Sequence, residues 1–350
     1  MTTRRLERLV AIASLLILWR GGALVSPQPG SPRDPGIARG ARRAASDLRF
    51  AVIVRGLGGD PAFERTFALW TERLCHLVLE RWRFRPEHVF VLTPDGRGCS
   101  PQAARATAEA LRRVFERLRI ESTEESLLFI ILIGHGSFDG QRGYFHLVGP
   151  DLSAEDFDAL LAGVKARSVV FVNTTSASGA FLPVMSRPGR IVITATRSGR
   201  EQQATLFADS FIEAFTDARA DTDKDGRTSL AEAFVFATRM TAEHYAQQGL
   251  LATEHPLLDD DGDGVGHGEL SGGDGALARR VYLEAPAEVG EADEELRVLL
   301  RERDALLQKI EALKARKAEM RPEEYERELE RWLVELARIT GRIRARGKTP

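Results

Sequence analysis

The chain has 350 residues, 43% of them hydrophobic, which is enough apolar surface for one large core or two modest domains and excludes global disorder. Its formal net charge of −2 gives no indication of a nucleic-acid binder. Its two cysteines, Cys75 and Cys99, are too few for a disulfide scaffold or a zinc site.

Residues 1–26 have the pattern of an export signal. Three arginines in the first eight residues precede an apolar run, residues 9–19, and small residues follow. The run is shorter than the about 20 residues that a transmembrane helix needs. The pattern predicts a signal peptide, with a short signal anchor as the alternative. We therefore expect a periplasmic or extracellular protein, either free or held at the membrane by an uncleaved segment.

The segment 27–47 is rich in proline, glycine and arginine, which predicts a flexible linker. After export, Cys75 and Cys99 would be in an oxidising compartment, where cysteines can pair. Nothing in the sequence fixes the distance between the two, so their pairing stays open.

Residues 48–285 alternate nearly continuous apolar runs with helical stretches. The predicted strands are 49–55, 88–92, 126–133, 168–173 and 190–196, and the predicted helices are 62–83, 101–119, 153–162 and 203–217. Apolar runs of this kind are typical of strands covered on both faces. The alternation predicts an α/β fold with a mainly parallel sheet and right-handed crossovers. Functional residues in such sheets collect at the carboxyl ends of the strands.

The residues that follow the predicted strands differ in the chemistry that they could carry out. The first ends in a glycine turn, but Pro61 takes the place of the third glycine of a dinucleotide-binding fingerprint. The strand 126–133 is followed by "GHGS", in which His135 lies between two glycines. The strand 168–173 ends in "NTTSASG". A histidine at one strand end and a nucleophile at the next are suited to acyl transfer.

The order of these features resembles the legumain-type cysteine peptidases of the caspase-like clan. In that family a His-Gly pair follows one strand, and Ala-Cys-x-Ser-Gly follows the next. The resemblance covers roughly residues 48–255 and implies that His135 is the catalytic histidine. It implies that the Gly136 amide helps to form the oxyanion hole, and it places Ser178 and Gly179 on the Ser-Gly pair.

The catalytic cysteine of the resembled family falls on Ser176. A serine hydroxyl, unlike a thiol, needs a base that is hydrogen-bonded to it. In this clan the histidine acts mainly on the leaving group, so the exchange is expected to abolish proteolysis. We therefore predict an exported pseudopeptidase that acts as a binding module for a peptide or protein, and the acidic loop 221–232, described below, adds calcium binding to this prediction. The alternatives are an active hydrolase that uses Ser176, or Thr175, with His135, and a structural protein that acts through its C-terminal hairpin.

Three further residues are candidates for a substrate pocket. Arg65, early in the first helix, corresponds to a basic pocket residue of the resembled family. Arg197 and Glu201 follow the last predicted strand and could line the same cleft. An arginine and a glutamate on one loop are also typical of a solvated ion pair.

The segment "DTDKDGRTSLAE", residues 221–232, matches a calcium loop of the EF-hand type. The predicted ligands are Asp221, Asp223, Asp225, the carbonyl of Arg227, and Glu232. Gly226 occupies the sharp turn, while Thr228 departs from the usual aliphatic residue. The alternative is an acidic turn in which Ser229 caps the next helix.

A second acidic segment repeats the spacing with Asp259, Asp261 and Asp263. Its twelfth position would be Leu270, and Glu269 falls one residue short. This predicts a weaker metal site, or an ordinary acidic loop.

Residues 291–346 carry two amphipathic stripes separated by "RPEEY", in which Pro322 suits the first turn of a new helix. The pattern predicts an antiparallel helical hairpin. Because its own core would be narrow, we expect it to contact another surface, either a protein partner or a second copy of the chain.

Overall fold

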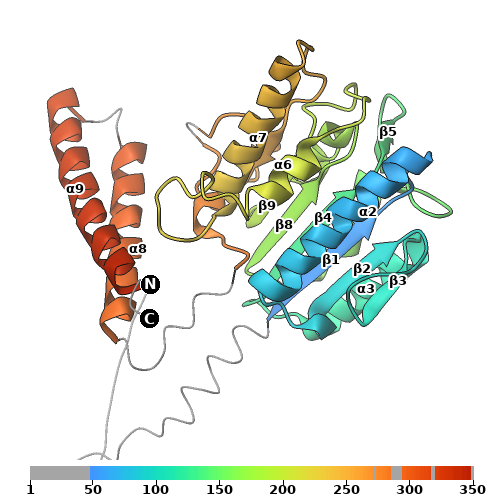
Figure 1. Ribbon diagram of the computed structural model, residues 1–350, viewed down its shortest axis with the longest axis horizontal. Helices are drawn as coiled ribbons and strands as arrows, with labels where there is room; N and C mark the ends of the chain where they lie inside the picture. The colour runs from blue at the N-terminus through green and yellow to red at the C-terminus, as the bar shows by residue number, and fades with distance from the viewer. Residues whose placement is uncertain (1–47, 271–272, 285–293, 317–319, 348–350) are drawn as a thin grey trace, which may run out of the picture. The chain divides into compact units, whose positions relative to one another are not determined.

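The computed structural model describes residues 48–270, 273–284, 294–316 and 320–347 (Figure 1). The predicted export signal and linker lie outside these residues. Within them, no helix combines the length and the apolar character needed to cross a membrane.

The centre of the fold is a seven-stranded sheet of order β10-β9-β8-β4-β1-β2-β3. The pairs are parallel except for β10 with β9. The strands are β1 (Arg49–Arg55), β2 (Val89–Thr93), β3 (Gln102–Arg105), β4 (Leu127–Ile133), β8 (Ser168–Asn173), β9 (Arg190–Thr194) and β10 (Leu257–Asp259). The predicted mainly parallel α/β sheet is confirmed.

Helices cover both faces of this sheet, as the apolar strands require. Ala51 and Ile53 of β1 join the core on one face, while Val52 and Val54 join the core on the other. On the first face lie α2 (Pro61–His76), α6 (Phe207–Glu213) and α7 (Leu230–Gln247), which Figure 1 shows together. On the second lie α3 (Ala108–Glu121), α4 (Ala154–Leu161) and α5 (Leu182–Met185).

A second, three-stranded antiparallel sheet follows β4 and was not predicted. It consists of β5 (Gly136–Phe138), β6 (Gly143–Phe145) and β7 (Leu152–Ser153). Its strands are short and its residues mixed in polarity, so they carry no periodic signal. Because β5 begins at Gly136, the residue after His135 is held in a strand.

Two predicted helices are wrong in part. The stretch 101–119 begins with β3, which pairs with β2 at the sheet edge, and its helix starts only after Thr107, whose hydroxyl accepts from the Ala110 amide. The stretch 203–217 becomes helical only at Phe207. Thr205 instead donates its hydroxyl to the Thr174 carbonyl, which holds the residues before the helix against the end of β8.

The cysteines are paired. A disulfide joins Cys75 in α2 to Cys99 in the turn between β2 and β3, over a sequence separation of 24. The sequence left this open, and the pairing is typical of proteins from oxidising compartments.

The predicted antiparallel hairpin is confirmed as α8 (Glu294–Ala315) and α9 (Pro322–Gly347). Arg342 near the end of α9 pairs with Glu295 at the start of α8, which sets the antiparallel direction. Leu299, Leu306 and Ile339 form the small core between them, with Trp332, Leu336 and Ile343 packed against it.

Candidate active site

His135 lies in the two-residue link between β4 and β5, and its ring packs against the first helix, α2. Its Nε2 donates to the Gly58 carbonyl at 3.1 Å, which makes Nε2 the protonated nitrogen. The rings of Phe63 and Phe67 meet it edge-on, with centroids 4.7 and 5.1 Å away. Burial lowers the pKa of His135, so the neutral ring is favoured.

Ser176 lies directly against Gly136 at the neighbouring strand end. Its hydroxyl donates to the Gly136 carbonyl at 2.9 Å and accepts from the Gly136 amide at 3.1 Å. The residue is only 4% exposed. The hydroxyl proton is therefore committed to a backbone carbonyl, and the amide expected to stabilise an oxyanion already has an acceptor.

Glycine is required at position 136 for this approach. A Cβ there would lie 2.5 Å from the Ser176 carbonyl oxygen and 2.7 Å from the Thr175 hydroxyl. The sequence resemblance gave Gly136 the role of an amide donor. The structure adds that the absence of a side chain lets β5 pack against the turn that follows β8.

The turn after β8 is held by its own polar side chains. Asn173 Oδ1 accepts from both the amide and the hydroxyl of Thr175, and the Thr174 hydroxyl donates to the Leu132 carbonyl in β4. Ala177 has a positive φ of 57°, and its amide donates to the Glu201 carbonyl at 2.7 Å. Thr175, the alternative nucleophile, is completely buried and its hydroxyl is already bonded.

These contacts decide what the arrangement can do chemically. The structure brings Ser176 and Gly136 together, but among the described residues no hydrogen bond joins His135 to Ser176. A serine nucleophile needs a base within hydrogen-bond reach. Here the hydrogen-bond partners of the hydroxyl are the backbone carbonyl and amide of Gly136, which cannot remove its proton.

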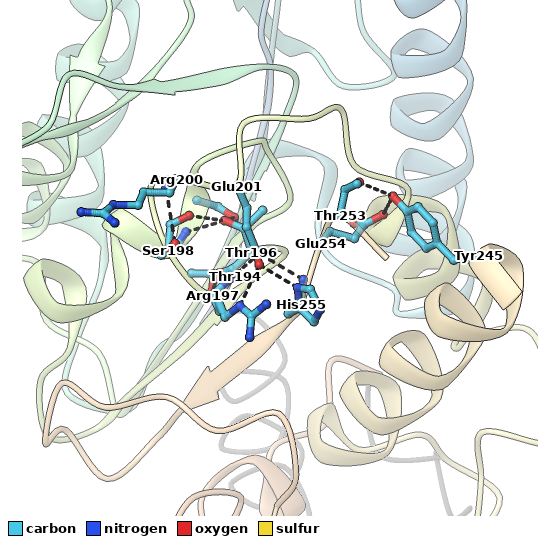
Figure 2. Close-up of polar contacts among 12 residues, drawn as sticks. Thr194, Thr196, Arg197, Ser198, Arg200, Glu201, Tyr245, Thr253, Glu254 and His255 are labelled. Atoms are coloured by element: carbon cyan, nitrogen blue, oxygen red, sulfur yellow. Dashed lines mark hydrogen bonds and ion pairs between the residues drawn. The ribbon is translucent and has the colours of Figure 1, made fainter. Parts of the chain in front are cut away.

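Of the predicted pocket residues, two form an ion pair and the third lies apart. Arg197 Nε donates to Glu201 at 2.8 Å, and the Arg197 amide donates to the same carboxylate at 3.0 Å. His255 also donates to the Glu201 carboxylate, from Nδ1 at 2.7 Å and from its amide at 3.2 Å. Figure 2 shows the side chains of Arg197 and His255 pointing toward Glu201. Arg65 is exposed on α2, and no contact with the other two is described for it.

Glu254, the neighbour of His255, is a buried carboxylate that sequence reasoning missed. It is 2% exposed and accepts from the amides of Leu206 and Phe207, and also from the Tyr245 hydroxyl at 3.1 Å (Figure 2). Desolvation by burial raises the pKa of Glu254 to about 7. No motif surrounds it, so only the fold reveals its partners.

Together, Glu254 and His255 fasten both ends of the segment 201–207. This segment also contacts the turn after β8, through the Glu201 carbonyl and the Thr205 hydroxyl. The loop that leaves β9 is therefore fixed against the candidate site, while Gln202, Gln203 and Ala204 at its tip are exposed.

The first acidic loop brings its three aspartates together as predicted. Ligand oxygens of Asp221, Asp223 and Asp225 lie within 4.8 Å of one another, as in a site that could hold a metal ion. Partial desolvation, and then repulsion from Asp225 and Glu232, raise the pKa of Asp223 to about 7. A bound cation would relieve the repulsion among these carboxylates.

The other predicted ligands of this loop are arranged differently. The Glu232 carboxylate accepts from Ser229 and Thr222 and so completes the cap of α7. Arg227 brings its guanidinium to 3.6 Å from Asp225. Asp225 also accepts from Arg303 of α8 at 2.7 Å. The capping function of Ser229, which the sequence gave as an alternative to calcium, is present alongside the three converging aspartates.

The second acidic loop also converges. Oxygens of Asp259, Asp261 and Asp263 lie within 4.8 Å of one another. The Asp259 side chain accepts from the amides of Gly262 and Gly264, so one of the three carboxylates already stabilises the turn. The two triads could each bind a metal, and neither identifies the ion.

No family model and no curated protein matches this sequence. Among solved structures, the chain is similar to a secreted C11 cysteine protease from Bacteroides thetaiotaomicron, whose structure contains an irreversible peptide inhibitor. The identity is 11%, the TM-score is 0.35, and the match covers 61% of this chain and 66% of that chain, slightly under two thirds of its length. That protein is a cysteine protease, whereas the legumain-type assignment stays a prediction from the sequence.

Proposed function

We propose that this protein is an exported member of the caspase-like clan, related to the legumain-type peptidases, that does not cleave peptides and instead binds a peptide or protein. The observation that carries the proposal is the pair of hydrogen bonds between the Ser176 hydroxyl and the Gly136 backbone. The Ser176 hydroxyl, at the nucleophile position, is hydrogen-bonded to the Gly136 amide that would stabilise an oxyanion, so neither group is free for a substrate carbonyl.

The position of His135 supports the same proposal. In a hydrolase that uses serine, the ring nitrogen would accept the hydroxyl proton. Here Nε2 donates to the Gly58 carbonyl, and two phenylalanine rings hold the imidazole in that orientation. That bond leaves Nδ1 as the unprotonated nitrogen, but among the described residues no hydrogen bond joins the ring to Ser176, whose hydroxyl would have to leave the Gly136 carbonyl for its proton to be removed.

Export and calcium binding complete the proposal. The disulfide between Cys75 and Cys99 is in keeping with an oxidising compartment, as is the pattern of residues 1–26. Calcium is proposed for the 221–232 loop because oxygen ligands in an EF-hand spacing suit this cation.

Two surfaces are proposed for partners. A peptide or protein would bind beside the loop that leaves β9, where Arg197 is exposed and the loop is fixed by Glu254 and His255. The hairpin of α8 and α9 would contact a further protein or a second copy of the chain.

Activity-based labelling tests the loss of catalysis. We expect the purified chain to remain unlabelled by a fluorophosphonate and by peptide-ketone probes of varied sequence. Ser176→Ala and His135→Ala would then give the same blank result as the unmodified chain. Ser210→Ala serves as a control, since Ser210 lies in α6 and no side-chain hydrogen bond is described for it.

Labelling of the unmodified chain that disappears in both Ser176→Ala and His135→Ala would overturn the proposal in favour of an active hydrolase. Binding is tested separately, by screening an immobilised peptide library. Specific binding that is lost in Arg197→Ala would place the ligand beside the 197–206 loop.

A further inference from the structure

An arginine interrupts the apolar stripe of α8. Leu299, Leu306 and Ile310 of that stripe are 1%, 4% and 3% exposed, and Arg303 lies between them on the same face of the helix. The Arg303 side chain is itself only 2% exposed. A guanidinium buried among apolar side chains is costly unless a carboxylate lies beside it. The hairpin therefore carries a charge that requires a negative partner.

Asp225 of the 221–232 loop is such a partner. Its Oδ2 accepts from Arg303 Nη1 at 2.7 Å, and its side chain is 1% exposed. The Tyr282 hydroxyl donates to the same oxygen at 3.3 Å. The Arg227 guanidinium stacks over the Tyr282 ring, 3.8 Å from its centroid. This cluster ties the hairpin to the domain that is built on the seven-stranded sheet.

A buried ion pair of this kind is suited to a contact that can open. Two charges buried together gain little over apolar side chains of the same size, because each loses its hydration. Either charge left alone in the interface is strongly unfavourable, so the pair is specific. The Arg303–Asp225 contact therefore fixes where the hairpin docks without making the docking strong.

We propose that the Arg303–Asp225 contact is a latch that holds the hairpin on the domain, and that a calcium ion in the 221–232 loop opens it. The proposal rests on the calcium binding proposed above for this loop. Asp225 is one of the three aspartates whose oxygens lie within 4.8 Å of one another, so the ion and the guanidinium use the same carboxylate.

The two cations would lie too close together for both to be favourable. A calcium ion lies about 2.4 Å from a carboxylate oxygen, so an ion bound to Asp225 would be within about 6 Å of Arg303 Nη1. Like charges at that distance repel, and salt screens a buried pair much less than an exposed one. The coupling is reciprocal: the factor by which Arg303 weakens calcium binding is the factor by which calcium weakens docking. The released hairpin is then free to contact the partner proposed for it.

Spin labels on the domain and on the hairpin measure the latch in the full chain. Glu243→Cys in α7 and Glu328→Cys in α9 provide exposed labelling positions, and the native cysteines are protected in their disulfide. We expect a narrow distribution of label distances in a calcium chelator and a broad one in saturating calcium. In Asp223→Asn, which removes a ligand but not the latch, the distribution should stay narrow in both conditions.

Variants of Arg303 test the competition directly. Arg303→Met should give a broad distribution without calcium and should bind calcium at least about tenfold more tightly, because no guanidinium competes. Arg303→Lys, which keeps the charge, should stay closer to the unmodified chain. The control Arg338→Met, which removes an exposed arginine of α9, should change neither property. Calorimetric titration in an Asp261→Asn background limits the measurement to the first loop.

The outcomes separate this inference from the proposed function. Calcium that binds the unmodified chain without changing the label distances would overturn the inference and leave the calcium site intact. The same holds if Arg303→Met binds calcium with unchanged affinity, or if the distribution is already broad in the chelator. A chain that binds no calcium, both unmodified and as Arg303→Met, would overturn the proposed calcium site and the inference with it.

Discussion

Replacing Ser176 with alanine would remove both hydrogen bonds that its hydroxyl makes with Gly136. The effect of this change on stability separates an anchored hydroxyl from a catalytic one. Catalytic groups are often held at a cost to the fold, so their removal tends to leave stability unchanged or to raise it. Removal of an anchored hydroxyl leaves buried backbone groups without partners.

The size of the loss follows from the contacts. The buried Gly136 amide would lose its acceptor, which costs about 1–3 kcal/mol, and loss of the hydrogen bond to the carbonyl adds about 0.5–1.5 kcal/mol. Both residues are buried, so water would not readily replace the hydroxyl. We expect the free energy of unfolding of Ser176→Ala to fall by about 2–4 kcal/mol.

Urea denaturation followed by circular dichroism measures this difference, provided that the slope with denaturant is unchanged. Ser210→Ala, which removes a hydroxyl with no described partner, should stay within about 0.5 kcal/mol of the unmodified chain. If Ser176→Ala were as stable as the unmodified chain or more so, the hydroxyl would not be anchored as described. The argument against catalysis would then fail.

Three further outcomes are expected. The pKa of Glu254 is raised in the folded chain to about 7 from 4.5, so its contribution to stability is present below pH 4.5 and is lost as the pH rises to about 7. The free energy of unfolding should change by about 3 kcal/mol over this range. In Glu254→Gln the denaturation midpoint should depend less on pH between these values. Reducing Cys75–Cys99, which closes a loop over a separation of 24, should cost about 3 kcal/mol, and a Cys75→Ser/Cys99→Ser variant should show no response to the reductant. Calcium should raise the melting temperature of the chain. Asp223→Asn should remove most of that increase, and it should also stabilise the metal-free chain because it removes one of the repelling carboxylates. An increase that persists in Asp223→Asn but not in Asp261→Asn would assign the ion to the second loop.

The main sheet could be predicted from the sequence because its strands are buried on both faces. Runs such as residues 126–133 have no polar interruption, and helices of suitable length separate them. The stretch that became β3 could not be assigned in the same way. Its alanines favour a helix, and only the pairing with β2 makes this stretch a strand.

The candidate site could be located from the sequence but not described. Strand order brings position 176 beside Gly136, and this much follows from the topology. The direction of the Ser176 hydroxyl depends on the Gly136 backbone, and that of the His135 imidazole on Gly58, Phe63 and Phe67, all of them distant in sequence. Glu254 and His255 were missed because each is defined by partners about 50 residues away.

The serine at position 176 and the orientation of His135 are best explained together. A hydroxyl is a stronger hydrogen-bond donor and acceptor than a thiol, so serine suits a position between a backbone carbonyl and an amide better than cysteine would. Once the amide at Gly136 is bonded to that hydroxyl, an imidazole nearby has no developing charge to assist. The Gly58 carbonyl and the aromatic rings then fix its orientation through Nε2. Restoring a cysteine alone would therefore return the nucleophile, with Nδ1 of His135 left as the nitrogen that could take up a proton.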